Sequence, residues 1–137
     1  MRKILIATHG YLANGVKSSI EILCGVKNNI SYINAYVNDN NIEEEIDLFF
    51  KNLKPNDEAV IFTDLFGGSV NQRLVPYCSK PNVYIISGFN LAIILEIVLK
   101  DGSLSEEEIT KLVEHSRKQL VYIKKEDLSK RKNEEFF

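Results

Sequence analysis

The sequence predicts an α/β fold: a three-layer open sheet, mostly parallel, with helices on both faces. Short, unbroken apolar runs recur at 4–7, 59–62 and 83–86, and such runs are typical of strands buried on both faces. Stretches with apolar residues at helical spacing separate these runs. Strands that alternate with helices along the chain favour parallel strands joined by right-handed crossovers.

The first strand and helix follow from the start of the chain. Residues 4–7 are apolar and end in polar Thr8. Apolar side chains then recur at helical spacing from Leu12, and Gly25 stands where that helix is expected to end. Residues 30–37 are rich in β-branched and aromatic side chains, which predicts the second strand.

The second helix has signals at both of its ends. Asn41 and Glu44 approximate a capping box at its start. Apolar residues then trace one face over 42–53, and Pro55 closes the segment.

The middle of the chain continues the alternation. Residues 59–62 are expected to form the third strand, and a helix is expected to start near Ser69 and to end or kink at Pro76. The fourth strand is predicted at 83–86, and an apolar helix at 91–99.

The last elements are a capped helix and a short strand. Ser105 and Glu108 form a capping box for the final helix. The short apolar run 120–123 is expected to form a final strand. We therefore predict one domain over residues 1–123, followed by a charged tail over 124–137.

Two titratable side chains are expected to meet at the carboxyl ends of neighbouring strands. The strand order 2-1-3-4 places the first and third strands side by side at the topological switch point, where open α/β sheets bind ligands. Thr8, His9 and Gly10 end the first strand, and Asp64 follows the third. Adjacent strand axes lie about 5 Å apart, so His9 and Asp64 are within hydrogen-bonding reach under this order.

This pairing suits phosphoryl transfer through a histidine. A carboxylate at Asp64 that accepts the Nδ1 proton of His9 fixes the tautomer and leaves Nε2 free to attack an electrophile. Gly67, Gly68 and Ser69 lead into a helix, and their backbone N–H groups are candidates for holding an anion. The sequence therefore predicts a phosphohistidine at His9 beside a phosphate-binding turn.

Composition excludes several other classes of function. The 137 residues carry a net charge of −2, which disfavours a nucleic-acid-binding face. The longest apolar stretch, 91–99, is too short to span a bilayer, and no secretory leader is recognised. Cys24 and Cys78 lack metal-ligand spacing and are expected to be buried thiols, as suits a reducing cytoplasm. No nucleotide-binding motif is present, and neither a metal nor a cofactor is expected.

Three signatures resemble those of the mannose-family IIA proteins of the bacterial sugar phosphotransferase system. Residues 8–15 (T-H-G-Y-L-A-N-G) are similar to the opening motif of that family. Residues 64–69 (D-L-F-G-G-S) resemble its second signature, and residues 88–91 (G-F-N-L) the motif after the fourth strand. Val70 and Ala92 depart from the pattern, in which proline is frequent at these positions.

The resemblance implies a role for each matching residue. His9 matches the histidine that takes a phosphoryl group from the phosphocarrier HPr and passes it to a IIB component. Asp64 matches the aspartate that orients this histidine. Ser69, with the backbone of Gly67 and Gly68, matches the phosphate-binding turn.

Other residues around the crevice are candidates for support or docking. Phe66 and Phe89 are our first candidates for contacts with HPr and IIB. Asn90 matches a family residue near the site with no assigned role. Thr8 and Gly10 are candidate supporting residues beside the histidine.

The resemblance also implies partners and assembly. The family forms homodimers that exchange their last antiparallel strand, here 120–123. Membrane components IIC and IID would be reached only indirectly, with no direct membrane insertion and no nucleic acid. The expected location is cytoplasmic.

Three alternatives remain open at this stage. One is a regulatory or interaction module with the same fold and no role in transport. Another is the IIA-like phosphotransfer subunit of a dihydroxyacetone kinase. A small-molecule hydrolase is disfavoured, because no serine or cysteine nucleophile stands at a strand end together with a base.

Overall fold

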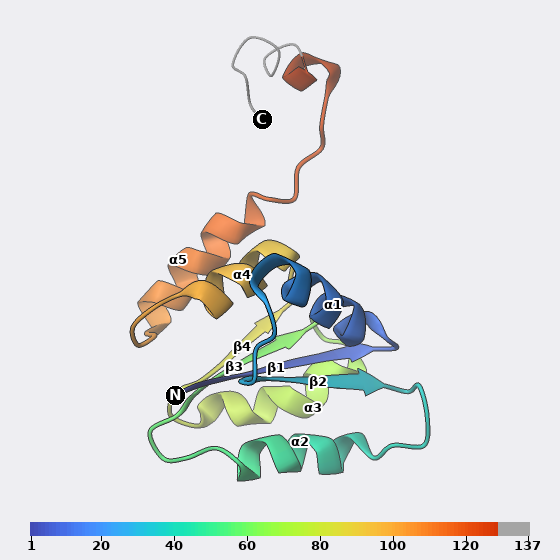
Figure 1. Ribbon diagram of the computed structural model, residues 1–137, viewed down its shortest axis with the longest axis vertical. Helices are drawn as coiled ribbons and strands as arrows, with labels where there is room; N and C mark the ends of the chain where they lie inside the picture. The colour runs from blue at the N-terminus through green and yellow to red at the C-terminus, as the bar shows by residue number, and fades with distance from the viewer. Residues whose placement is uncertain (129–137) are drawn as a thin grey trace.

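A computed structural model describes residues 1–128 of the protein as a sheet covered by helices on both faces (Figure 1). The strands are β1 (Arg2–His9), β2 (Ile30–Ala35), β3 (Glu58–Thr63) and β4 (Val83–Ser87). The helices are α1 (Leu12–Cys24), α2 (Ile42–Lys51), α3 (Ser69–Leu74), α4 (Leu91–Leu99) and α5 (Glu106–Arg117), and a 3₁₀ helix, η1, spans Val75–Ser79.

The four strands are parallel and lie in the order β2-β1-β3-β4, which confirms the predicted topology. The register places Ala7 of β1 opposite Thr63 of β3. On the other side of β1, His9 stands opposite Ala35 of β2. The carboxyl ends of β1, β2 and β3 therefore meet at one edge of the sheet.

The two faces of the sheet bury separate hydrophobic cores. Along β1 the side chains alternate, because successive residues of a strand point to opposite faces. Ile4 and Ile6 pack with residues of α1 and α4, whereas Leu5 and Ala7 pack with residues of α2 and α3. Figure 1 shows the same three layers, with α2 and α3 on one face and α1, α4 and α5 on the other.

The predicted helix signals act where they were expected. Oδ1 of Asn41 accepts a hydrogen bond from the backbone N–H of Glu44 at 3.2 Å, and Oγ of Ser105 accepts one from Glu108 at 3.2 Å. Gly25 ends α1 with a φ of 83°. Helix α3 ends at Leu74, two residues before Pro76, and the chain continues as the 3₁₀ helix η1.

The second strand is shorter than predicted, and the reason is local. It ends at Ala35 rather than at 37, because the next residue, Tyr36, adopts a left-handed conformation with a φ of 68°. A left-handed residue turns the chain out of the extended conformation that a strand requires. Tyr36 is thereby directed towards the carboxyl edge of the sheet.

The predicted last strand at 120–123 does not form within the described part of one chain. After α5 this segment runs away from the sheet (Figure 1), and Leu120 and Tyr122 are 89% and 78% exposed. A strand needs the backbone of a neighbour, and the segment passes neither edge of its own sheet. Exchange with a second copy and the boundary between 1–123 and 124–137 stay predictions, and residues 129–137 lie outside the described residues.

The cysteines correct one expectation. Cys24 is half-buried in α1, where its thiol donates to the carbonyl of Ile20, but Cys78 is exposed in η1. Pro76 replaces an expected helical turn with a 3₁₀ turn, which leaves the Cys78 side chain outside the core. Within residues 1–128, no helix has the length and apolar character needed to cross a bilayer.

Candidate functional site

His9 and Asp64 meet at the carboxyl edge of the sheet, at the ends of β1 and β3. Nδ1 of His9 lies 3.0 Å from Oδ2 and 3.2 Å from Oδ1 of Asp64. The carboxylate is also fixed by backbone donors, because Oδ2 accepts the N–H of His9 at 2.8 Å and Oδ1 that of Leu65 at 3.0 Å. The aspartate is therefore held in one orientation before it contacts the imidazole.

The contact with Asp64 defines the tautomer of the imidazole. An ionised carboxylate only accepts hydrogen bonds, so Nδ1 carries the proton and Nε2 carries the lone pair. Nε2 points towards Oγ of Ser69, 3.2 Å away. The Asp64 side chain is 10% exposed and the His9 side chain 37% exposed. The imidazole is thus anchored at its buried nitrogen and accessible at the nitrogen that is free to react.

The glycine turn after β3 uses its backbone N–H groups within the turn in this structure, and its predicted phosphate-binding role stays a prediction. The N–H of Gly67 donates to Oδ1 of Asn71 at 3.0 Å, and that of Gly68 donates to the carbonyl of Leu65 at 3.1 Å. Both N–H groups are therefore engaged within the turn. Gly67 has a φ of 78°, which favours glycine. In this conformation the two glycines shape the turn, and Ser69 presents the polar group nearest to Nε2.

Gly68 is closely packed against Leu65 within the same turn. A Cβ at this position would lie 3.2 Å from Cβ and 3.3 Å from the carbonyl oxygen of Leu65, and 3.4 Å from Cε1 of His9. The contacts with Leu65 are shorter than comfortable packing allows, whereas the contact with the imidazole is an ordinary one. A glycine here therefore suits the tight turn itself.

Sequence reasoning missed Asn71, which holds the glycine turn in place. This side chain is only 2% exposed. Its amide nitrogen donates to Oγ1 of Thr63 at 3.1 Å and to Oγ of Ser87, while its oxygen accepts from Gly67. One side chain thus joins the ends of β3 and β4 to the turn. The available signal was an amide side chain on the face of α3 whose other residues are apolar.

Sequence reasoning also missed Tyr36, which follows β2 at the same edge. Its hydroxyl lies 2.8 Å from Oγ of Ser69, and its ring centroid lies 5.7 Å from that of His9, tilted by 45°. The ring is 53% exposed. Nothing in the sequence signalled this role, because the predicted second strand over 30–37 includes Tyr36.

Comparison with known proteins identifies the family of this chain. The sequence matches the EIIA-man family model, described as the PTS system fructose IIA component, over residues 3–115. The chain belongs to this family. The resemblance read from the three sequence signatures is therefore confirmed, and the protein is a IIA component of the phosphoenolpyruvate-dependent sugar phosphotransferase system (PTS).

Solved structures show the same fold. A Klebsiella pneumoniae protein described as a sugar PTS permease is 29% identical, with a TM-score of 0.79 over 88% of this chain and 90% of that chain. The PTS component EIIA of Streptococcus agalactiae is 27% identical, with a TM-score of 0.74 over 89% and 97%. The IIA protein associated with the fucose utilization operon of Streptococcus pneumoniae is 26% identical, with a TM-score of 0.75 over 88% and 92%. No protein with a curated function matches the chain significantly.

In this IIA component, Thr8 and Gly10 support the loop that carries His9. Oγ1 of Thr8 accepts the N–H of Ala13 at 2.8 Å, which satisfies a free donor at the start of α1. Gly10 has a φ of 60° and donates to the carbonyl of Ala35 at 2.8 Å. These contacts hold the chain on either side of His9.

The two phenylalanines proposed for docking differ in their exposure. Phe66 is 88% exposed at the tip of the turn after Asp64. Phe89 is partly buried and packs edge-on against Phe62, with 6.2 Å between the ring centroids. Of the two candidates, Phe66 is the more exposed.

Asn90 has a structural task in this IIA component. Its Oδ1 accepts the N–H of Ile93 at 3.0 Å and caps α4. Its amide nitrogen donates to the carbonyl of Ser116 near the end of α5 at 2.7 Å. Asn90 therefore connects two helices beside the site, and no contact with His9 is recorded for it.

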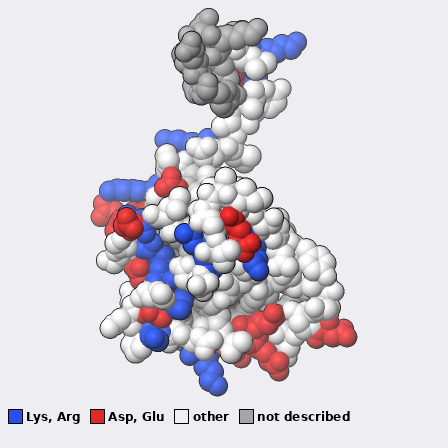
Figure 2. Space-filling view, viewed as in Figure 1, with Lys and Arg blue, Asp and Glu red and all other residues white. Residues whose placement is uncertain are grey.

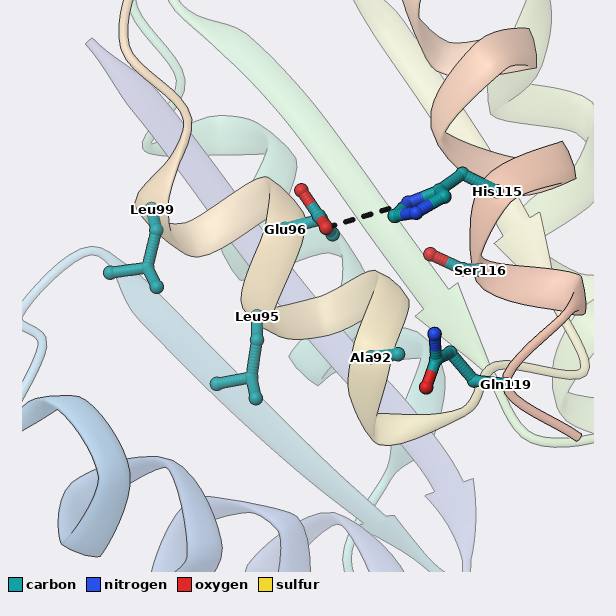
Figure 3. Close-up of a pocket in the computed structure, with 7 residues that line it drawn as sticks. All are labelled: Ala92, Leu95, Glu96, Leu99, His115, Ser116 and Gln119. Atoms are coloured by element: carbon teal, nitrogen blue, oxygen red, sulfur yellow. Dashed lines mark ion pairs between the residues drawn. The ribbon is translucent and has the colours of Figure 1, made fainter. Parts of the chain in front are cut away.

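The second histidine lies apart from this site. His115 is exposed on α5, and its Nδ1 lies 3.6 Å from Oε1 of Glu96 on α4, across a shallow pocket (Figure 3). Both side chains of this pair are open to solvent, unlike the anchored pair of His9 and Asp64.

On the face seen in Figure 2, acidic and basic side chains are mixed, without a continuous basic surface.

Proposed function

We propose that this IIA component is a phosphocarrier that accepts a phosphoryl group from phospho-HPr on Nε2 of His9 and passes it to a IIB component. The supporting observation is the anchored contact between Nδ1 of His9 and Asp64, which directs the lone pair of Nε2 outward. Ser69, 3.2 Å from Nε2, is placed to donate to a phosphoryl oxygen.

Each transfer forms one N–P bond and breaks another. The lone pair of Nε2 attacks phosphorus, and the N–P bond of the donor histidine breaks with its electron pair left on the donor imidazole. The Nδ1 proton of His9 stays in place throughout. The carboxylate of Asp64 stabilises the positive charge that develops on the ring, as an aspartate does beside the histidine of serine proteases. The same steps in the other direction deliver the group to IIB.

Labelling with radioactive phosphate tests this proposal directly. Wild-type protein is incubated with enzyme I, HPr and labelled phosphoenolpyruvate, in parallel with His9→Ala and with His115→Ala as the matched control. We expect stoichiometric label in the wild type and in His115→Ala, and none in His9→Ala. Full labelling of His9→Ala would overturn the assignment of the phosphorylated residue.

The acceptor distinguishes the remaining alternatives. Purified phosphorylated protein is mixed either with a mannose-family IIB component or with a dihydroxyacetone kinase. Transfer of the label to IIB supports a role in sugar transport. In that role IIC and IID act downstream in the membrane, and this protein lies in the cytoplasm. Delivery to the kinase alone would identify its phosphotransfer subunit. A stable phosphorylated form that delivers to neither would favour a regulatory module.

The assembly we propose is a homodimer formed by strand exchange. Residues 120–123 present four apolar side chains to solvent. Strand β4 pairs only with β3, which leaves its other edge open within residues 1–128. An exposed apolar segment and an open strand edge are complementary when they belong to two copies.

Analytical ultracentrifugation of the full chain tests this assembly. We expect a dimer for the wild type and a monomer for the double variant Leu120→Glu/Tyr122→Glu, because two carboxylates would be buried at the exchanged strand. Glu substitutions at Lys17 and Lys111 of the helical surface provide a matched control and should leave the dimer intact. A monomeric wild type at micromolar concentrations would contradict the proposal.

A further inference from the structure

Tyr36 is held in an unfavourable backbone conformation at the edge of the proposed site. Its φ of 68° is left-handed, and among residues 1–128 only Asn82 shares this feature outside the glycines. Such a conformation is costly for a residue that carries a Cβ, and residues of this kind gather at functional sites. Burial does not explain it, since the side chain is 53% exposed. The recorded polar contact of the side chain is with Ser69.

The hydrogen bonds around Ser69 have a definite direction. In the neutral imidazole, with its proton on Nδ1, Nε2 of His9 carries a lone pair, and the single hydroxyl proton of Ser69 then points towards it across 3.2 Å. The Ser69 oxygen is then the acceptor, and the Tyr36 hydroxyl, 2.8 Å away, is the donor. The proton order therefore runs from Tyr36 to Ser69 to His9. The hydrogen bonds in such a chain strengthen one another.

Ser69 depends on Tyr36 for a fixed orientation. Within residues 1–128, the side-chain partners of its hydroxyl are His9 and Tyr36. Ser69 is exposed, and without Tyr36 its hydroxyl would be held only by its 3.2 Å contact with Nε2 of His9, in competition with water. Tyr36 thus restricts the rotation of the Ser69 hydroxyl before the transfer begins, so that this conformational entropy is not lost during the transfer.

We infer that Tyr36 is a positioning residue for phosphoryl transfer at His9. Its hydroxyl fixes the Ser69 hydroxyl as a donor, first to the lone pair of Nε2 and then, once the N–P bond has formed, to an oxygen of the phosphoryl group. This inference rests on the proposed function of His9. Tyr36 touches neither reacting nitrogen in this scheme and acts through Ser69.

A double-mutant cycle tests whether Tyr36 acts through Ser69. Single-turnover transfer from phospho-HPr is measured for Tyr36→Phe, Ser69→Ala and the double variant, with Tyr11→Phe as the control. Loss of one neutral hydrogen bond predicts transfer about three- to tenfold slower in Tyr36→Phe. The double variant should be no slower than Ser69→Ala, and Tyr11→Phe should match the wild type. Independent, multiplicative effects of the two substitutions would overturn the inference.

A second readout needs no phosphoryl donor. The ¹⁵N resonance of His9 Nε2 in the resting protein reports whether its lone pair accepts a hydrogen bond. We expect Tyr36→Phe and Ser69→Ala to shift this resonance in the same direction, towards that of a free lone pair, whereas Tyr11→Phe leaves it in place. An unmoved resonance in Tyr36→Phe would show that Tyr36 does not orient Ser69. If wild-type protein takes no label from phospho-HPr but the resonance shifts as expected, the proposed donor is wrong and the positioning role stands.

Discussion

The strands β1 and β3 carry an ionisable pair at each of their two ends, and the two pairs differ in what they leave free. At the amino edge, Arg2 and Glu58 pair at 3.3 Å with side chains that are 11% and 16% exposed. At the carboxyl edge, His9 and Asp64 pair at 3.0 Å, and the histidine is 37% exposed. The same two adjacent strands bring both pairs together, so strand order alone does not distinguish a structural pair from a reactive one.

The amino-edge pair uses nearly all of its hydrogen-bonding capacity on the fold. The guanidinium of Arg2 donates to the carbonyl oxygens of Ile97, Lys100 and Gly102, and thereby closes the end of α4 and the loop after it. At the carboxyl edge, Asp64 is fixed in the same manner, but Nε2 of His9 faces only an exposed hydroxyl. His9 keeps a ring nitrogen that the fold does not use and that solvent can reach. This makes the pair of His9 and Asp64 suited to chemistry.

The largest effect is expected from breaking the amino-edge pair. Arg2→Met keeps the aliphatic packing but leaves Glu58 without its ion-pair partner, with only the backbone N–H of Leu104 as a donor, and leaves three carbonyl groups without the guanidinium. We expect the free energy of unfolding to fall by about 3 kcal/mol, with phosphoryl transfer intact at low temperature. Urea denaturation measures the loss, and Lys111→Met, in an exposed ion pair with Glu107, should cost less than about 0.5 kcal/mol.

The corresponding change at the carboxyl edge should act on rate rather than on stability. Asp64→Asn keeps the shape of the side chain but removes the charge that supports the imidazole. We expect transfer from phospho-HPr to slow by about 100-fold, which corresponds to roughly 2.7 kcal/mol, with a much smaller change in the free energy of unfolding. Rapid-quench kinetics and urea denaturation provide the two measurements. Equal rates in the variant and the wild type would show that the carboxylate only supports the fold.

A smaller effect of opposite sign is expected at Tyr36. Tyr36→Gly removes the backbone strain, and after the greater chain entropy of glycine is subtracted, we expect a stability gain of about 0.5 kcal/mol. Transfer should nevertheless become slower, because Ser69 loses its partner. Asn82→Gly, at a φ of 62° near the amino edge, is the matched control and should leave transfer unchanged. A loss of stability in Tyr36→Gly would show that the ring contributes more to the fold than the strain costs.

The smallest effect concerns the pH dependence of stability at the amino edge. The backbone N–H of Lys54 lies 3.0 Å from Oδ2 of Asp57 and the Met1 ammonium 3.1 Å from Oδ1. Together these donors hold the pKa of Asp57 below its ordinary value. A depressed native pKa contributes stability at neutral pH that is lost as the pH falls through it. Urea midpoints between about pH 5 and pH 2 should therefore fall less steeply in Asp57→Asn.

The buried strands and the helix caps could be predicted because each depends on residues that are neighbours in the sequence. The strand order was a hypothesis based on the fold class, and the structure confirms it. Once β1 and β3 are adjacent, the residues at their carboxyl ends have little freedom in where they lie. The roles of these two side chains in transfer remain proposals.

The other parts of the site depend on contacts that local patterns do not encode. Tyr36 belongs to a predicted strand by propensity, and only tertiary structure shows that it leaves the strand in a left-handed turn. Asn71 is an ordinary helical position in the sequence, yet it is a buried amide in the structure. The N–H groups of Gly67 and Gly68 were expected to face an anion, and the fold directs them into the turn. The strand at 120–123 requires a neighbouring backbone that its own chain does not bring to it.

The buried amide of Asn71 has a consequence for how the protein meets its partners. Because it fixes the glycine turn to two strand ends, the position of this turn beside the imidazole is set by contacts within the chain itself. A partner that binds here then loses little binding free energy to rearrangement of the turn, and it gains no contacts that such a rearrangement would create. In the proposed function one protein loads His9 and another unloads it, and rigidity at this turn is compatible with brief encounters and rapid exchange between the two.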